Sequence, residues 1–302
     1  KAAEGRFAPQ AAGAALSWAG SLQPFHPTLI EVITMYTRIL VPVDGSLFAE
    51  QLVAPASKVA QATGAELALL RVVERDDAQD FAKTYVEALA APLGATALCV
   101  RAGKDGVAAA IRDEAKRVGG TLVAICSQAR SGAMQAIFGS VALQVLRELG
   151  EPLVAFCPHP DGPAALSKVA QVVLPLDGSA LSESIAPHAA MLAKWLGARL
   201  VVVSVVEPQA PLDANVMSGD VQESGYVRSK ANELADRYGV AVTWEVLHGE
   251  PKEAIPRFVR SLGDAMLAMS THGRTGLRAV MAGSVTAQCL RESQVPVYIR
   301  LP

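Results

Sequence analysis

The sequence predicts an α/β protein made of two tandem, doubly wound parallel-sheet domains of Rossmann-like architecture. Three observations carry this prediction. The chain has 302 residues, enough for two domains of ordinary size. One stretch of sequence occurs twice along it. Within each copy, short apolar runs alternate with amphipathic segments through five strands, the pattern of a parallel sheet covered on both faces.

The repeat is clearest at the first strand of each copy. TRILVPVDGS ends at Ser46, and AQVVLPLDGS ends at Ser179, 133 residues later. The same spacing relates residues 64–74 to 197–207. It widens to 144 residues between FGSV at 138–141 and AGSV at 282–285. The second copy therefore has a longer central region, at 208–241.

The repeat sets the expected domain boundaries, 36–160 for the first half and 167–302 for the second. His159-Pro-Asp-Gly-Pro163 has the composition of a linker. Residues 1–35 are rich in Ala, Gly, Ser and Pro, and we expect them to be a disordered leader, an expression remnant or a stretch upstream of the true start. A signal peptide is the alternative, but its apolar stretch is mostly Ala and Gly and carries Pro9.

Each strand is expected where β-branched and apolar residues form a short run. The expected strands are 38–43, 67–73, 98–101, 122–126 and 153–156, then 171–176, 200–206, 243–247, 265–270 and 297–300. Helices are expected between them, and Gly64 and Gly197 end the first helix of each half as C′ glycines. Pro55 and Pro187 fall inside these first helices and predict kinks. The remaining helices are expected at 80–91, 107–118 and 141–149, then at 221–238, 253–262 and 285–292.

Composition excludes several classes of partner. With 27 basic and 29 acidic side chains, the net charge of −2 provides no global field for nucleic acid or an anionic membrane. The longest apolar runs are far shorter than the ~20 residues of a membrane span. The four cysteines and five histidines are scattered, without the spacing of a metal site or a redox pair. We therefore expect buried thiols, no metal centre and a cytoplasmic location.

Ligands of doubly wound sheets bind beyond the carboxyl ends of the strands. Two loops of each half lie there, Asp-Gly-Ser after the first strand and a loop after the fourth. In the second half that loop reads STHGRTGL from Ser270 and continues to AGSV, which opens a helix. Glycines and a helix N-terminus present backbone N–H groups to an anion, although a capped turn that binds nothing has the same pattern. Neither a P-loop nor a dinucleotide-binding motif is present.

Five motifs in order resemble the universal stress protein family: LPLDGS, VVVSVVE, HGEP at 248–251, STHGRTGLRAVMAGSV and the final VPVYI. The resemblance covers both halves. It implies strand order 3-2-1-4-5 in each, and ATP binding through Gly-x2-Gly-x9-Gly-Ser/Thr, as in many members.

The resemblance implies an adenine-nucleotide site mainly in the second half. Asp177 matches the acidic residue beside the ribose and phosphates, and Val205 the residue whose backbone faces adenine. Ser270 departs from the motif, because it stands at its first glycine. The expected binding residues are Pro175, Leu176, Asp177, Val205, Ser270, His272, Gly273, Arg274, Gly283, Ser284, Val285 and Thr286.

The first half departs further, because Cys126 and Ala129 replace two glycines of its loop. A side chain at a position that needs positive φ costs on the order of 1 kcal/mol. We therefore expect a weaker or empty first site, formed by Asp44, Val72, Arg130, Gly139 and Ser140.

Three functions remain open. The first is a regulatory stress protein that binds ATP, or AMP or another adenine nucleotide, with Mg²⁺. The second is a slow ATPase or an adenylyl- or phosphoryl-transferring enzyme that uses Asp177 to hold Mg²⁺. The third is a scaffold that has lost nucleotide binding. The last strands of the halves, 153–156 and 297–300, are expected to pair and form an intramolecular pseudo-dimer, and a homodimer of the whole chain also stays open.

Overall fold

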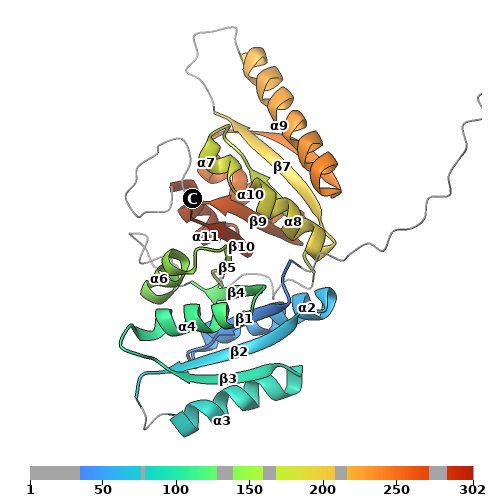
Figure 1. Cartoon of the computed structure of the whole chain (residues 1–302). Coiled ribbons are helices and arrows are strands. Elements are labelled where there is room, and N and C mark those ends of the chain that lie inside the picture. Colours follow the sequence, from blue (N-terminus) through green and yellow to red (C-terminus); the bar gives the residue numbers. More distant parts are fainter. Residues whose placement is uncertain are drawn as a thin grey trace, which may run out of the picture. The chain divides into compact units, whose positions relative to one another are not determined.

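The computed structural model describes residues 35–75, 79–127, 139–158, 168–207, 216–271 and 284–301, all within the compact unit Thr34–Pro302. The expected leader up to residue 34 and the linker at 159–163 lie outside the described residues. In Figure 1 the first half runs from blue to green and the second from yellow to red. Strands and helices alternate along both halves.

The first half contains five strands in the expected order. Its elements are β1 (Arg38–Pro42), α1 (Leu47–Glu50), α2 (Val53–Thr63), β2 (Glu66–Val73), α3 (Gln79–Ala90), the 3₁₀ turn η2 (Ala91–Leu93), β3 (Thr96–Arg101), α4 (Gly106–Arg117), β4 (Thr121–Cys126), α6 (Ser140–Leu149) and β5 (Leu153–Phe156). The strand runs are rich in Leu, Val and Ile, which suits strands buried on both faces.

The second half repeats this order. Its elements are β6 (Gln171–Pro175), α7 (Ala180–Glu183), α8 (Ala186–Leu196), β7 (Arg199–Val206), α9 (Val216–Tyr238), β8 (Val242–His248), α10 (Pro251–Leu262), β9 (Ala265–Ser270), α11 (Ser284–Glu292) and β10 (Val297–Arg300). Helix α9 has 23 residues against 12 in α3, so part of the longer central region of the second copy is helical.

The strands form one sheet with the order β3-β2-β1-β4-β5-β10-β9-β6-β7-β8. Each half on its own therefore has the order 3-2-1-4-5 with parallel pairing, and this prediction is confirmed. The halves meet where β5 pairs with β10, Val154 lying opposite Tyr298. That pairing is antiparallel, so the ten-stranded sheet is mixed. The two strands that the sequence analysis expects to pair do so.

Alternate side chains of each strand enter different layers of the core. Ile39 and Val41 of β1 pack with buried residues of α2, α3, α8 and α9. Leu40, between them, packs with buried residues of α4, α6, α10 and α11. A strand's side chains alternate between its two faces, so helices cover both faces of the sheet. The doubly wound α/β prediction is thereby confirmed.

The prolines in the first helix of each half act differently from the expectation. Instead of kinking one helix, Pro55 and Pro187 lie in the first turn of a new one, α2 or α8, after the short helix α1 or α7 has ended. A proline ring clashes with the carbonyl four residues before it. For Pro187 that residue is Glu183, the last of α7. The break therefore falls where the clash would occur. Gly64 and Gly197 then end α2 and α8 with φ of +72° and +61°, as predicted.

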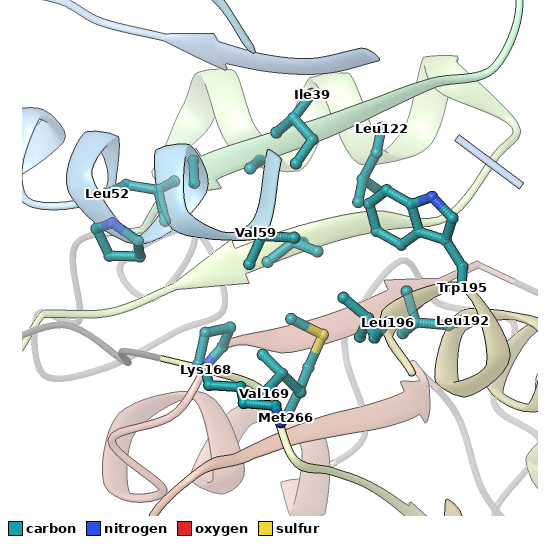
Figure 2. A pocket seen from close by; sticks show the side chains of 15 residues that line it. Ile39, Leu52, Val59, Leu122, Lys168, Val169, Leu192, Trp195, Leu196 and Met266 are labelled. Carbon is teal, nitrogen blue, oxygen red and sulfur yellow. The ribbon is translucent and has the colours of Figure 1, made fainter. Parts of the chain in front are cut away.

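Beside the β5–β10 pairing, apolar side chains of both halves surround a cavity of about 40 Å³. Figure 2 shows Ile39, Val59 and Leu122 of the first half facing Leu192, Trp195 and Met266 of the second. The Trp195 ring also meets the ring of Tyr36 edge-on, with the centroids 5.3 Å apart. The two halves thus share a packed apolar contact as well as strand pairing.

Among the described residues, no helix is long and apolar enough to cross a membrane.

Candidate functional site

The candidate site of each half lies where its first, second and fourth strands end. Parallel strands bring their carboxyl ends to one edge of the sheet, and ligands of doubly wound proteins bind there. In the second half the loop after β6 carries Asp177, β7 ends with Val205 and Val206, and β9 ends at Ser270. In the first half β1, β2 and β4 end in the same arrangement.

The turn after β6 holds the Asp177 carboxylate in a defined position. Its Oδ1 accepts hydrogen bonds from the Ser179 N–H at 3.0 Å and from the Ser179 hydroxyl at 2.6 Å. Ser179 in turn caps α7, since its hydroxyl accepts from the Ser182 N–H. The Asp177 N–H lies 3.3 Å from the Ser182 hydroxyl. The Asp-Gly-Ser segment therefore forms a pre-organised acidic turn at the sheet edge.

The turn after β1 repeats this geometry. Asp44 Oδ1 accepts from the Ser46 N–H at 2.9 Å and the Ser46 hydroxyl at 2.6 Å, and Ser46 caps α1. Burial works to raise the pKa of Asp44, but the two Ser46 hydrogen bonds and the charge of Arg71 outweigh it and hold the pKa below its usual value. Asp44 is thus a carboxylate at neutral pH.

The two residues just before the Asp177 turn are held by contacts with β7. Pro175 is the last residue of β6, and its register partner in β7 is Val203. Leu176 follows at 3% exposure, and its N–H donates to the Val203 carbonyl at 2.8 Å. These contacts fix the place where the chain leaves the sheet. The backbone atoms of Pro175 and Leu176 therefore lie at the border of the candidate site.

The second strands supply the residues expected beside adenine. Val205 is half-buried and pairs in register with Leu247 of β8, while Val72 is buried and pairs with Val100 of β3. Both lie one residue before the end of their strand. Their side chains pack on the layer that contains α4 and α10.

The helix that follows the fourth strand is tied back to that strand in the second half. The Thr286 hydroxyl, in the first turn of α11, donates to the Ser270 carbonyl at 3.0 Å, and both residues are buried. Ser284 is exposed as the first residue of α11, and Val285 is half-buried beside it. The Thr286 contact therefore brings the N-terminus of α11, with its N–H groups and positive dipole end, to the carboxyl end of β9.

In the first half, Gly139 is the N-cap residue of α6 and Ser140 is its first helical residue. Gly139 has φ of +72°, a conformation that strongly favours glycine, and its carbonyl accepts from the Leu143 N–H. Ser140 is exposed as the first helical residue. Five of the expected binding residues, Arg130, His272, Gly273, Arg274 and Gly283, lie outside the described residues.

A cavity of about 350 Å³ lies at the first-half site. Asp44, Val72, Gly139 and Ser140, four of the five residues expected there, line it. Further residues that line it and that the sequence analysis did not select as ligands are Phe48, Arg71, Val107, Ile111 and Cys126. The structure thus brings together the described members of the predicted first-half set.

Cys126 stands where the resemblance expects the first glycine of the loop. Its thiol donates to the Phe48 carbonyl at 3.2 Å, which ties the end of β4 to α1. Burial, together with the neighbouring Cys157 and the charge of Asp44, raises the pKa of the Cys126 thiol to about 12. Cys126 is therefore a neutral hydrogen-bond donor at neutral pH.

Sequence reasoning missed a tyrosine–glutamate hydrogen bond that occurs in both halves. The Tyr226 hydroxyl of α9 donates to Glu183 of α7 at 2.8 Å, and the Tyr85 hydroxyl of α3 donates to Glu50 of α1 at 2.7 Å. Glu50 and Glu183 are separated by the same 133 residues as the two aspartates. That spacing was a usable signal for the glutamates, whereas the tyrosines, 141 residues apart, fall outside the register of the repeat.

Within the described residues no group of three or more His, Cys, Asp and Glu side chains could hold a metal ion. The geometry instead offers each site an acidic turn, a strand end and a helix N-terminus. That combination suits a ligand with a phosphate group and a polar sugar.

Comparison with known proteins identifies the family of this chain. The universal stress protein family model matches twice, at residues 35–156 and 169–299. The Universal stress protein MJ0531 of Methanocaldococcus jannaschii is 30% identical over 136 residues, which cover 43% of this chain and 80% of that protein.

Among solved structures, a universal stress protein from Archaeoglobus fulgidus DSM 4304 matches 88% of this chain and 98% of its own, with a TM-score of 0.59 and 19% identity. A shorter match, over 43% of this chain and 94% of the other, is a universal stress protein in complex with cAMP, with a TM-score of 0.37 and 21% identity. The family model covers most of the chain in two copies, and the chain therefore belongs to the universal stress protein family as a tandem member.

Proposed function

We propose that this chain is a regulatory stress-response protein that binds an adenine nucleotide, ATP in the first instance, mainly in its second half. The observation that carries the proposal is the meeting of three features at one sheet edge. These are the Asp177 turn, the end of β7 at Val205, and the N-terminus of α11, which Thr286 holds against Ser270.

Each feature has a chemical counterpart in a nucleotide. Backbone N–H groups at the start of α11, with the exposed Ser284 hydroxyl, suit the phosphates. The Asp177 carboxylate suits ribose hydroxyls or a magnesium ion that accompanies the phosphates. Backbone groups at the end of β7 suit the edge of the adenine ring. Residues His272, Gly273, Arg274 and Gly283 belong to the same proposal through the family motif.

We further propose that the first half, 36–160, binds nucleotide more weakly than the second, 167–302. Cys126 and Ala129 stand where the family motif has glycines, and the Cys126 thiol is already engaged by the Phe48 carbonyl. The cavity beside Asp44 still has a volume of about 350 Å³. The difference between the halves then lies in the loop chemistry. We also propose that the two halves act as an intramolecular pseudo-dimer, which the pairing of β5 with β10 supports.

Calorimetric titration of ATP with Mg²⁺ into the intact chain tests the proposal, with Asp177→Ala and Asp44→Ala as a matched pair. Both variants lose the same turn hydrogen bonds, one in each half. One strong site that is lost in Asp177→Ala and kept in Asp44→Ala supports the second half as the sensor. Equal losses would contradict the assignment to the second half, and an absence of binding to the wild type would overturn nucleotide binding altogether.

A further inference from the structure

Helix α7 has four residues, about one turn, which is too short to be stable without tertiary contacts. It carries Ser179 as its N-cap, and Ser179 fixes the Asp177 carboxylate. Whatever holds α7 therefore also holds the acidic turn of the proposed nucleotide site.

Two side chains of α9 contact Glu183, the last residue of α7. The Tyr226 hydroxyl donates to Glu183 Oε1 at 2.8 Å, and Lys230 Nζ lies 2.8 Å from Glu183 Oε2. Tyr226 and Lys230 are four residues apart and so share one face of α9. Both oxygens of the Glu183 carboxylate are thereby engaged by α9, and hydrogen bonds to a charged group are the stronger kind.

Tyr226 also reaches the start of the same unit. Burial and Glu183 raise the pKa of Tyr226, and the nearby Gly178 backbone N–H, at the centre of the Asp-Gly-Ser turn, acts in the opposite direction. One hydroxyl therefore bonds to the last residue of α7 and lies near Gly178 of the turn. The bond to Glu183 joins the segment 178–183 to a helix that packs along β7 and β8.

A corresponding bond in the first half shows that the arrangement does not depend on the length of the helix. Tyr85 of the 12-residue α3 donates to Glu50 at 2.7 Å, as Tyr226 of the 23-residue α9 donates to Glu183. Leu89 takes the place four residues after Tyr85, where α9 has Lys230. The second half thus adds an ion pair to the shared tyrosine–glutamate bond.

We propose that Tyr226 is a positioning residue of the second-half nucleotide site, which holds the Asp177 turn in its binding geometry through Glu183 and α7. The inference rests on the proposed function. It assigns to α9 a direct influence on nucleotide affinity, although Tyr226 acts on the turn rather than on the ligand.

The test compares Tyr226→Phe with Tyr85→Phe in the intact chain. Phenylalanine keeps the ring and removes the hydroxyl, so each variant loses one tyrosine–glutamate bond. ATP affinity with Mg²⁺ is measured by calorimetry, and the backbone amide signals of Gly178 and Ser179 are followed by NMR without ligand. We expect Tyr226→Phe to weaken ATP binding about tenfold and to shift both amide signals, and Tyr85→Phe to leave the strong site within about twofold.

Glu183→Gln keeps an acceptor for the tyrosine while it removes the ion pair with Lys230, and it is expected to bind ATP more tightly than Tyr226→Phe does. This variant serves as a control for unfolding of α7, because unfolding of that helix would weaken ATP binding equally in Glu183→Gln and Tyr226→Phe. If the wild type binds ATP and Tyr226→Phe binds equally well with unmoved amide signals, the positioning role is overturned while the proposed function stands. If the wild type does not bind ATP, the proposed function itself is overturned, and with it the positioning role that rests on it.

Discussion

The hydroxyl groups of Tyr36 and Tyr298 lie 2.7 Å apart and form a hydrogen bond between the two halves of the chain, 262 residues apart in sequence. Tyr36 is 7% exposed and Tyr298 is fully buried. Tyr36 precedes the first strand, and Tyr298 lies in β10, the strand that pairs with β5 of the first half. The bond therefore adds a polar, directional contact beside the apolar side chains of both halves that line the cavity of Figure 2.

We expect Tyr36→Phe to lower the free energy of unfolding by about 1–2 kcal/mol, because it leaves the buried Tyr298 hydroxyl without its partner. The double variant with Tyr298→Phe should cost clearly less than the sum of the single variants, since neither hydroxyl then needs a partner. Urea unfolding of the four proteins measures this. Additive losses would show that the bond contributes nothing specific.

Alkaline pH should weaken the same contact. Burial, partly offset by the Tyr298 hydrogen bond and reinforced by the charge of Glu151, raises the pKa of Tyr36 to about 12. An unfolded tyrosine has a pKa near 10. The stabilisation is thus fully present below about pH 10 and is lost as the pH rises towards 12. In urea unfolding from pH 8 upwards, the Tyr36→Phe/Tyr298→Phe variant should lose less stability than the wild type. If the free energies of unfolding of the two proteins fall in parallel with pH, this prediction is wrong.

A buried ion network at the start of β1 gives the chain its expected acid sensitivity. Arg38 is 2% exposed and donates to Glu114 Oε1 at 2.9 Å, and Arg117 donates to both Glu114 oxygens at 2.8 Å. Glu114→Ala leaves the buried guanidinium without its counter-ion and should cost about 3 kcal/mol or more. Arg117→Ala, with a side chain 60% exposed, should cost less than about 1 kcal/mol. Comparable losses of stability in Glu114→Ala and Arg117→Ala would contradict the conclusion that burial makes the Arg38–Glu114 pair the more important one.

The pH dependence of this network has the opposite sign to that of the tyrosines. Hydrogen bonds from Arg117, opposed by burial and supported by Arg38, hold the pKa of Glu114 below its usual value. The stabilisation is therefore present above the ordinary carboxyl pKa of 4.5 and is lost as the pH falls through the lower pKa of the folded state. Below pH 4.5 the wild type should lose stability faster than Glu114→Ala does in thermal unfolding. If stability falls equally steeply with pH in the two proteins, Glu114 is not the source of the acid sensitivity.

Filling the cavity of Figure 2 should stabilise the chain. Val59 faces this space of about 40 Å³ from α2, and Val59→Ile adds one methylene without changing the branching at Cβ. We expect a gain of about 0.5–1 kcal/mol in urea unfolding. Val86→Ile is the control, because Val86 of α3 is fully buried and does not line the cavity, so the added group should overpack its surroundings. Destabilisation by both variants would show that the space cannot accept an atom.

Much of the fold could be predicted from local patterns. Runs such as Leu200–Val206 could form little other than buried strands, and the 133-residue repeat carried the assignment from one half to the other. The prolines were misread because their effect depends on where the helix restarts: Pro187 is tolerated in the first turn of α8 and would break a helix that continued from α7.

The candidate site was less accessible from sequence, because its support comes from distant residues. The Asp44 and Asp177 turns were predictable, since Asp-Gly-Ser forms its hydrogen bonds within three residues. The Tyr226–Glu183 bond spans 43 residues and joins two helices whose relative rotation no local pattern specifies. The resemblance placed Cys126 at the first glycine of the motif, but the bond of its thiol to Phe48 depended on the placement of α1.

The contact between Thr286 and Ser270 leads to a prediction that separates support of the helix from contact with the ligand. The Thr286 hydroxyl is buried and donates to the Ser270 carbonyl, so Thr286→Val removes the donor at nearly constant volume. We expect a loss of about 1–2 kcal/mol in the free energy of unfolding, because the carbonyl stays buried without that partner, and a weaker affinity for ATP, because the start of α11 is no longer tied to β9.

Thr286→Ser keeps the hydroxyl, although it loses a methyl group, and should retain most of the ATP affinity. Urea unfolding and calorimetric titration of the two variants distinguish the alternatives. Loss of affinity in Thr286→Val alone supports a helix that must be anchored in order to present its N–H groups to phosphate. Unchanged affinity in both variants, with stability lost only in Thr286→Val, would mean that the Ser270–Thr286 bond stabilises the fold and that the nucleotide does not depend on the position of α11.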